Sequence, residues 1–345
     1  MSLHSEILEQ PACLERVLVS QRKNVEYIAK AIRSQDIRFA FLAARGTSDN
    51  AGRYANYLWG ALNGLPMALA TPSLFTYYQL PPKLKSALVV GVSQSGQSPD
   101  IVSVLQEGKR QGNLTLAITN APDSPLANSA DFVLDIEAGP ELAVAATKTY
   151  TTELMGIAML SAALANDATR WNELEQVAGW VKNVLEQDPI IQQAAQRYRY
   201  MQQCVVLGRG FNYATAFEWA LKLKELTYVA AEPYSSADFK HGPVAMVAQG
   251  FPVMTVLPTG KVFDSMLEFL KHLQAELLAE LIVISNSPDA LSTAQIAFTI
   301  PADIPEWLSP LVCIVPAQLF SYYLTLAKGF DAEKPRTISK VTETH

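Results

Sequence analysis

The chain has 345 residues, of which 27 are Lys or Arg and 33 are Asp or Glu, so its formal net charge is −6. Hydrophobic residues make up 49% of it, enough for about two ordinary domains with buried cores. The acidic balance and the lack of a basic run argue against a nucleic-acid-binding surface. Cys13, Cys204 and Cys313 lie far apart without Cys-x-x-Cys spacing, so we expect neither a disulfide framework nor a metal site.

The N-terminus, Met-Ser-Leu-His-Ser-Glu, has no basic segment followed by an apolar one. No run of about twenty apolar residues stands out elsewhere. We therefore expect a soluble, cytoplasmic protein that associates with neither membrane nor nucleic acid.

Residues 1–35 have helical periodicity and predict an N-terminal arm. The residues that follow alternate between short apolar runs and helical patterns, while 74–78 shows no clear element. Strands are expected at 38–44, 67–70, 88–92, 114–119 and 132–136. Alternation of this kind predicts a parallel α/β sheet covered by helices.

The strand at 88–92 runs into a turn that carries Ser93, Gln94, Ser95 and Gly96, just before a helical pattern. Side-chain donors and unpaired helix N–H groups at such a position attract an anion, and a phosphate fits there. The alternative is structural, with Ser98 capping a helix whose first residue is Pro99.

Residues 141–165 and 171–185 predict two long connecting helices. Beyond them, residues 204–210 repeat the pattern of a strand entering a glycine turn, and a helix is expected at 213–229. The second half then ends in a helix predicted at 315–326.

The second half of the chain repeats the first. Gly46 and Gly210 lie 210 − 46 = 164 residues apart, and Gly96 and Gly260 have the same spacing. The segment Asn-Ala-Pro-Asp at 120–123 likewise lies over Asn-Ser-Pro-Asp at 286–289. We infer an internal duplication of one α/β unit. The second copy reads Leu-Pro-Thr-Gly where the first reads Ser-Gln-Ser-Gly, so the phosphate is expected in the first half.

Three charged residues, Glu218, Lys222 and Glu225, share one helical face. They form either a salt-bridged, solvated face or a catalytic group. Residues 232–243 follow as an expected loop that presents His241, which is either structural or a general acid and base.

The chain ends in a polar tail from Gly329 onward that contains Lys340. Such a tail is either disordered, with Lys340 a solvated charge, or a lid over a site.

Together these motifs resemble the sugar isomerase (SIS) superfamily. They are similar to the isomerase part of glutamine-dependent glucosamine-6-phosphate synthase and to stand-alone SIS-type glucosamine-6-phosphate deaminases. The matching segments, in the family's order, are Gly46-Thr-Ser, Ser93-Gln-Ser-Gly, Val144-Ala-Ala-Thr-Lys, Leu207-Gly-Arg-Gly, Ala220-Leu-Lys-Leu-Lys-Glu, Ala231-Glu-Pro-Tyr, Lys240-His-Gly-Pro and Pro335-Arg-Thr-Ile-Ser-Lys.

The resemblance implies two tandem SIS subdomains, each a flavodoxin-like, three-layer α/β unit with a parallel sheet. The expected divisions are an arm at 1–35, a first SIS domain at 36–165, connecting helices at 166–200, a second SIS domain at 201–328 and an active-site tail at 329–345. It further implies a homodimer, with the histidine contributed across the subunit interface, and no cofactor.

The resemblance also assigns roles. Glu225 is expected to move a proton between C1 and C2, His241 to open the sugar ring and Lys340 to close over the open-chain sugar. The implied substrate-binding residues are Gly46, Thr47, Ser48, Ser93, Gln94, Ser95, Ser98, Val144, Ala145, Ala146 and Lys222.

Departures from the synthase pattern favour a deaminase that converts glucosamine 6-phosphate to fructose 6-phosphate and ammonia. The chain enters the isomerase part within about forty residues, without the synthase's ammonia-releasing domain. Ala146 replaces the family's serine, and the ending Ser339-Lys-Val-Thr-Glu-Thr is similar to that of the stand-alone deaminases. The alternatives are an aldose–ketose isomerase or a deglycase or deaminase for a related phosphosugar such as galactosamine 6-phosphate. A regulatory phosphosugar sensor would not need Glu225, His241 and Lys340 together.

Overall fold

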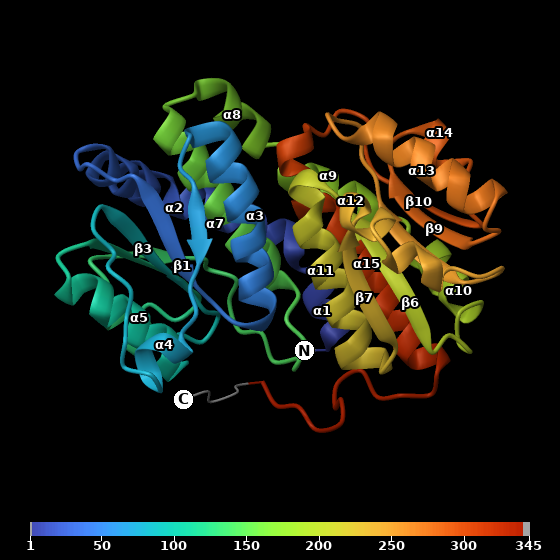
Figure 1. Cartoon of the computed structure of the whole chain (residues 1–345), viewed down its shortest axis with the longest axis horizontal. Helices are drawn as coiled ribbons and strands as arrows, with labels where there is room; N and C mark the ends of the chain where they lie inside the picture. The colour runs from blue at the N-terminus through green and yellow to red at the C-terminus, as the bar shows by residue number, and fades with distance from the viewer. Residues whose placement is uncertain (1, 341–345) are drawn as a thin grey trace. The chain divides into compact units, whose positions relative to one another are not determined.

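The computed structural model describes residues 2–340, so the end of the expected tail, 341–345, and residue 1 of the expected arm lie outside the described residues. The chain divides into two compact units, named here after their strands. The β1–β5 unit comprises residues 12–142, 146–176 and 339–340. The β6–β10 unit comprises residues 2–11, 143–145 and 177–338. Figure 1 labels many of the elements of both units.

The β1–β5 unit is built on a five-stranded parallel sheet in the order β2-β1-β3-β4-β5. Its strands are β1 (Phe39–Ala43), β2 (Met67–Leu69), β3 (Ala87–Val92), β4 (Leu114–Thr119) and β5 (Phe132–Asp135). Its helices are α2 (Gln10–Arg33, from residue 12), α3 (Gly46–Asn63), α4 (Ser73–Thr76), α5 (Pro99–Arg110), α6 (Pro125–Ser129), α7 (Lys148–Ala165) and α8 (Ala168–Leu174).

Strand β3 lies at the centre of this sheet, and all six of its residues are buried. Its side chains alternate between the two faces. Val89 packs with Val104 and Leu105 of α5 in one core layer, and the intervening residues face the side covered by α3 and α7. Burial on both faces explains why the sequence of β3 is apolar without alternation.

The β6–β10 unit holds a second five-stranded parallel sheet in the order β10-β9-β8-β6-β7. Its strands are β6 (Gln203–Gly208), β7 (Ala230–Ser235), β8 (Pro252–Val256), β9 (Glu280–Ser285) and β10 (Ile296–Thr299). Its helical segments are α1 (Leu3–Leu8), α9 (Val177–Leu185), α10 (Asp188–Gln196), η1 (Gly210–Asn212), α11 (Tyr213–Lys222), η2 (Leu223–Thr227), α12 (Ser236–Lys240), η3 (Pro243–Met246), α13 (Phe263–Ala275), α14 (Pro288–Leu291), η4 (Glu306–Leu308) and α15 (Ser309–Ala327).

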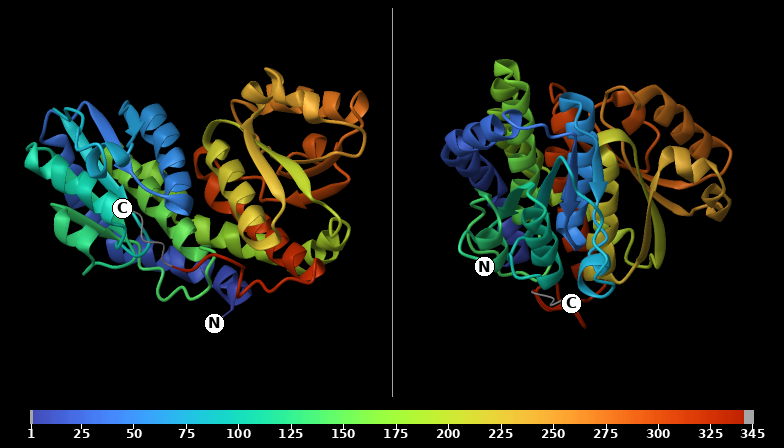
Figure 2. Two further views of the ribbon diagram at one scale, coloured as in Figure 1. Left: turned by 60° about the horizontal axis from the view of Figure 1, so that its bottom comes forward. Right: turned by 60° about the vertical axis from the view of Figure 1, so that its left-hand side comes forward.

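Helices also cover both faces of this second sheet. Phe269 and Leu270 of α13 pack with Val253 of β8 and Val283 of β9 in one core cluster. Helices α11 and α15 contact the same sheet, and Figure 2 shows them on the side away from α13. The three-layer α/β fold is therefore present twice.

The internal duplication is confirmed by the topology. Read from its other edge, the second sheet runs β7-β6-β8-β9-β10, which repeats the order β2-β1-β3-β4-β5. Corresponding strands of the two sheets are separated by the spacing found in the sequence. Strand β5 begins at Phe132 and β10 begins at Ile296, 164 residues later. The two halves are thus copies at the level of strand order as well as of motifs.

The expectation that no long apolar run exists is wrong for helix α15. The segment Glu306–Ala327 is long and apolar enough to cross a membrane by length and composition alone. However, 83% of its most apolar window is buried inside the protein. Packing against α9, α10 and α11 accounts for this burial, so the segment is a core helix of the β6–β10 unit.

Four local predictions are corrected by the structure. The helix expected at 141–165 begins only at Lys148, because the preceding residues wrap around a buried carboxylate described below. The helix expected at 171–185 is two helices, α8 and α9. The helix expected at 213–229 turns into a π-helix at Leu223 and ends before Tyr228, whose φ of 57° is left-handed. Residues 232–243 are not a loop, because they hold the end of edge strand β7 and helix α12.

Candidate active site

The turn after β3 is built by its own hydrogen bonds. Ser93 Oγ accepts the N–H of Gly96 at 3.1 Å, and Ser95 Oγ accepts the N–H of Gln97 at 3.3 Å. Gly96 has φ +62°, and a Cβ at this residue would lie 2.0 Å from Ser124 Oγ, so only glycine fits. The turn is therefore shaped before any ligand arrives.

Ser93 of this turn is buried, whereas three other polar side chains stay within reach of solvent. Gln94, Ser95 and Ser98 are half-buried. Ser98 does occupy the N-cap position of α5 with Pro99 next to it, but its side chain makes no capping hydrogen bond. The capping alternative therefore does not account for the Ser98 hydroxyl.

A second turn, after β1, lies at the same sheet edge because β1 and β3 are neighbouring parallel strands. Helix α3 starts directly at Gly46, whose φ is +53°. Ser48 is buried and donates from Oγ to Glu153 Oε1 at 2.8 Å. Thr47 is half-buried.

Arg45 connects the two turns and was missed in the sequence analysis. Its Nε and Nη2 atoms each lie 2.8 Å from Oδ2 of Asp100, which is buried in the first turn of α5. The Arg45 side chain remains 50% exposed, so it places a cation at the carboxyl edge of the sheet. The available signal was its position directly after β1, the strand beside β3.

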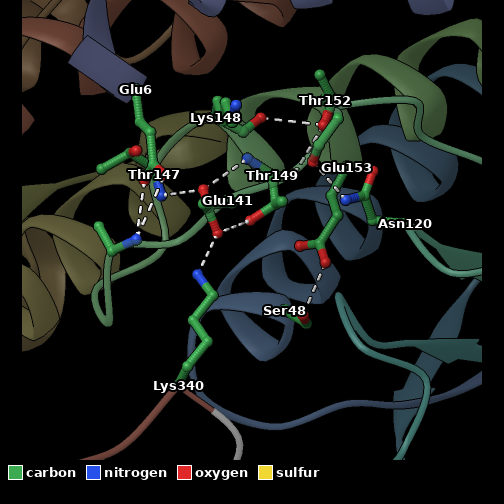
Figure 3. A network of polar contacts seen from close by, with 12 residues as sticks. Glu6, Ser48, Asn120, Glu141, Thr147, Lys148, Thr149, Thr152, Glu153 and Lys340 are labelled. Carbon is green, nitrogen blue, oxygen red and sulfur yellow. Dashed lines mark hydrogen bonds and ion pairs between the residues drawn. The ribbon is translucent and has the colours of Figure 1, made fainter. Parts of the chain in front are cut away.

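A buried carboxylate, Glu141, anchors Lys340 in the β1–β5 unit, as Figure 3 shows. Lys340 Nζ lies 2.6 Å from Glu141 Oε2, which also accepts the hydroxyl of Thr149 at 2.8 Å. Glu141 Oε1 accepts the backbone N–H groups of Thr147 at 2.9 Å and Thr149 at 3.1 Å. The Glu141 side chain is fully buried, whereas 23% of the Lys340 side chain is exposed. Lys340 is therefore an ordered, paired cation rather than a solvated charge.

The predicted sugar-lining residues Val144, Ala145 and Ala146 lie in the irregular segment before α7. Ala145 is buried, and its two neighbours are half-buried. Just before them, the N–H of Ala143 is 3.3 Å from both carboxylate oxygens of Glu6, a fully buried residue of α1. Glu6 and Glu141 were both missed, because nothing in the local sequence marks them as partners of these backbone groups.

In the β6–β10 unit, Lys222 joins two carboxylates. Its Nζ atom lies 2.5 Å from Glu225 Oε2 and 3.4 Å from Glu218 Oε1. Lys222 and Glu218 are buried, so the alternative of a solvated, salt-bridged face is wrong. Glu225 projects from the π-helical turn, and its side chain is 25% exposed. The cluster thus presents one partly accessible carboxylate held by a buried ammonium group.

His241 follows α12 directly, and it is exposed. Its backbone N–H donates to Asp238 O at 3.0 Å. Within residues 2–340, the imidazole makes no hydrogen bond or ion pair with Glu225 or Lys222. The structure therefore pairs Glu225 with Lys222, and among the described residues His241 does not share in this pairing.

No group of three or more His, Cys, Asp or Glu side chains among the described residues is placed to hold a metal ion. The three cysteines are buried, and none of them forms a disulfide within the described part of the chain. Burial raises the pKa of the Cys204 thiol to about 12 and that of the Cys313 thiol further.

Comparison with known proteins identifies the family. The SIS domain matches residues 35–163 and again 199–328. The chain belongs to the SIS domain family, with two copies of the domain.

Individual relatives extend this result. The chain is 33% identical over 344 residues to glutamine–fructose-6-phosphate aminotransferase [isomerizing] of Thermococcus kodakarensis, covering 97% of this chain and 56% of that protein. The chain thus spans about half the length of the curated relatives it matches. Among solved structures, the C-terminal domain of glucosamine-fructose-6-phosphate aminotransferase from Francisella tularensis has a TM-score of 0.87 at 28% identity, covering 96% of this chain and 98% of that one. Glucosamine-6-phosphate deaminase from Thermotoga maritima has a TM-score of 0.81 at 20% identity and covers both chains fully, which shows a shared fold.

Proposed function

We propose that this SIS protein is an amino-sugar phosphate deaminase that converts glucosamine 6-phosphate to fructose 6-phosphate and ammonia. The observation that carries the proposal is the Lys222–Glu225 pair, in which a buried ammonium holds a partly exposed carboxylate. A carboxylate placed in this way can take a proton from one carbon atom and return it to the next. The family relation, through a relative whose name describes an isomerizing aminotransferase, supports the same chemistry.

In this proposal the β1–β5 unit holds the phosphate. The hydroxyl and amide groups of Ser93, Gln94, Ser95 and Ser98 supply donors, and the half-exposed guanidinium of Arg45 supplies positive charge. Thr47, with the backbone of Gly46 and Ser48, lines the sugar. The sequence resemblance also assigns residues 144–146 to binding the sugar, and the side chain of Ala146 is smaller than the serine of the synthase pattern.

The proposed reaction then runs in three stages. His241 transfers a proton to the ring oxygen while the C1 hydroxyl gives up its proton, and the pyranose opens to the C1 aldehyde. Glu225 removes the proton from C2 and returns it to C1, while the C1 oxygen gains a proton and the C2 amine loses one. The C2 amine thereby becomes a ketimine. Water then adds to C2 and ammonia leaves, which yields the ketose.

Lys222 and Lys340 have different places in this scheme. Lys222 is buried between two carboxylates, so we assign it to positioning Glu225 rather than to direct contact with the sugar. Lys340 closes over the open-chain sugar. We also propose the other divisions of the chain that the sequence predicts, including a tail at 329–345 that carries Lys340.

We also propose that the enzyme is a cytoplasmic homodimer. His241 is exposed and forms no hydrogen bond or ion pair with Glu225 of its own unit among the described residues. A histidine in that position is suited to serve the site of a second subunit.

An aldose–ketose isomerase or a deglycase acting on a related phosphosugar is the alternative. Either reaction uses the same transfer of a proton between C1 and C2, so the Lys222–Glu225 pair fits both. The difference lies in the group attached to C2 and in whether ammonia is released.

The test is ammonia release from glucosamine 6-phosphate and, separately, from galactosamine 6-phosphate, with the sugar product identified by NMR. Ammonia and fructose 6-phosphate from the first substrate would establish the activity and the epimer. Glu225→Gln should abolish it, and Glu276→Gln, a change at an exposed carboxylate of the same unit, should leave it intact. No ammonia from either substrate would refute the deaminase and favour the isomerase, which is assayed on phosphosugars without an amine.

A further inference from the structure

The β6–β10 unit contains a second copy of the two glycine turns. Gly210 follows β6 as Gly46 follows β1, and the two have similar left-handed φ values of +61° and +53°. Gly260 follows β8 at the spacing with which Gly96 follows β3, although of these two only Gly96 has a left-handed φ. Because β6 and β8 are neighbouring parallel strands, the copied turns also meet at one sheet edge.

A carboxylate of the same unit lies against this second pair of turns. Glu306 Oε2 accepts the backbone N–H of Lys261 at 2.9 Å. A Cβ at Gly260 would lie 2.2 Å from Glu306 Cδ, so the carboxyl group rests directly on that glycine. A Cβ at Gly210 would lie 4.0 Å from Glu306 Oε1. The carboxyl group of Glu306 therefore sits between the two glycines.

The polar groups of the second turn are also satisfied from within. Asn286 Oδ1 accepts the N–H of Thr259 at 2.8 Å, and Asn286 Nδ2 donates to Thr259 Oγ1 at 3.0 Å. The matching residue of the first half, Asn120, directs its side chain elsewhere, to the backbone of Ala138 and Gly139. The hydroxyls of both turns therefore accept hydrogen bonds from within the protein, those of Ser93 and Ser95 from backbone N–H groups and that of Thr259 from Asn286.

Glu306 also has a counterpart in the first half. Pro140-Glu141 and Pro305-Glu306 each follow the last strand of their sheet, 306 − 141 = 165 residues apart. After Glu141, six residues precede helix α7, and this segment lets the carboxylate bind Thr147, Thr149 and Lys340. After Glu306, only Trp307 and Leu308 precede α15. The shorter connection keeps Glu306 at the glycine turns.

We infer that the second unit carries an anion-binding cradle for a phosphate monoester and that the carboxylate of Glu306 occupies it. A carboxylate and a phosphate are both anionic acceptors for backbone N–H groups, so one can replace the other. The chain therefore takes one phosphosugar although it has two copies of the turn. This inference rests on the proposed phosphate site after β3.

The experiment counts phosphate sites by equilibrium dialysis with labelled inorganic phosphate up to about 20 mM, which saturates a millimolar site. The wild-type chain should bind one phosphate, and Glu306→Ala should bind two. Glu276→Ala, a change at an exposed glutamate of the same unit, should bind one. Glu306→Ser also removes the carboxylate from the cradle, and it serves as a second variant should Glu306→Ala be unstable.

Combining the Glu306 substitutions with Ser95→Ala separates two hypotheses. One is the cradle of the β6–β10 unit that Glu306 occupies, and the other is the proposed phosphate site after β3. Glu306→Ala in that background should retain one site, the one in the β6–β10 unit. An unaltered site count in folded Glu306→Ala and Glu306→Ser would overturn the occupied cradle and leave the site after β3 intact. Wild-type protein that binds no phosphate, or that is unaffected by Ser95→Ala, would instead refute the proposed site after β3.

Discussion

The pair formed by Lys340 and Glu141 leads to a quantitative prediction. A hydrogen bond between charged partners contributes about 1.5–3 kcal/mol. Solvent reaches 23% of the Lys340 side chain, so a coupling near the lower end, about 1–2 kcal/mol, is expected. Such an energy corresponds to a factor of roughly 5–30 in the equilibrium between the closed and the locally opened segment around Glu141.

Glu141→Gln removes the contact with Lys340 while keeping the other hydrogen bonds of residue 141. In its less costly orientation the amide keeps its oxygen on the N–H groups of Thr147 and Thr149, and its NH₂ group faces the Thr149 hydroxyl, which can turn to accept. That orientation places the NH₂ group toward Lys340 and removes this contact alone. Lys340→Met removes the same contact from the other side.

The assay is amide hydrogen exchange of the peptide containing Thr147 and Thr149, whose N–H groups bind Glu141. Lys340→Met should accelerate exchange about 5–30-fold in the wild-type background and have little further effect in Glu141→Gln. Lys334→Met, which removes an exposed lysine of the same segment, is the matched control and should change neither. Equal acceleration by Lys340→Met in both backgrounds, or none in either, would refute the pairing.

Further predictions concern the other charged, polar and buried groups. Lys222→Met should lower the free energy of unfolding by about 3–5 kcal/mol, because it leaves the carboxylates of Glu218 and Glu225 without their shared ammonium group. A loss below about 1 kcal/mol in urea titrations would contradict this expectation. Ser95→Ala should raise KM, whereas Glu225→Gln should abolish turnover with calorimetric affinity for the phosphosugar retained; equal loss of affinity in both would make the role of Glu225 structural. The raised pKa of buried Cys204 favours the thiol in the folded state, so stability should fall as pH rises from about 8.5 toward about 12, and Cys204→Ala should reduce that fall.

Much of the fold could be predicted from the sequence, because short-range physics determines it. The apolar run of β3 has no alternation, since helices cover both faces of its sheet. The glycine at 96 marks a left-handed turn that no side chain could occupy. The spacing of 164 residues between copied motifs predicts two equivalent units, and strand order confirms them.

The local predictions that failed are those in which a distant group overrides local preference. Residues 141–147 have a helical apolar pattern, yet the buried carboxylate of Glu141 binds their backbone N–H groups and the helix starts later. Lys222 has the spacing of a surface salt bridge, yet packing buries it between two carboxylates.

The same reasoning applies to the site residues found only in the structure. Arg45 reaches Asp100 across 55 positions of sequence, Lys340 reaches Glu141 across 199, and Glu306 reaches Lys261 across 45. The sequence by itself determined the strands, the turns and the duplication, since each depends on neighbouring residues or on repetition. Tertiary structure alone decided these long-range contacts, because each forms only where folding brings groups that are distant in sequence within hydrogen-bond distance.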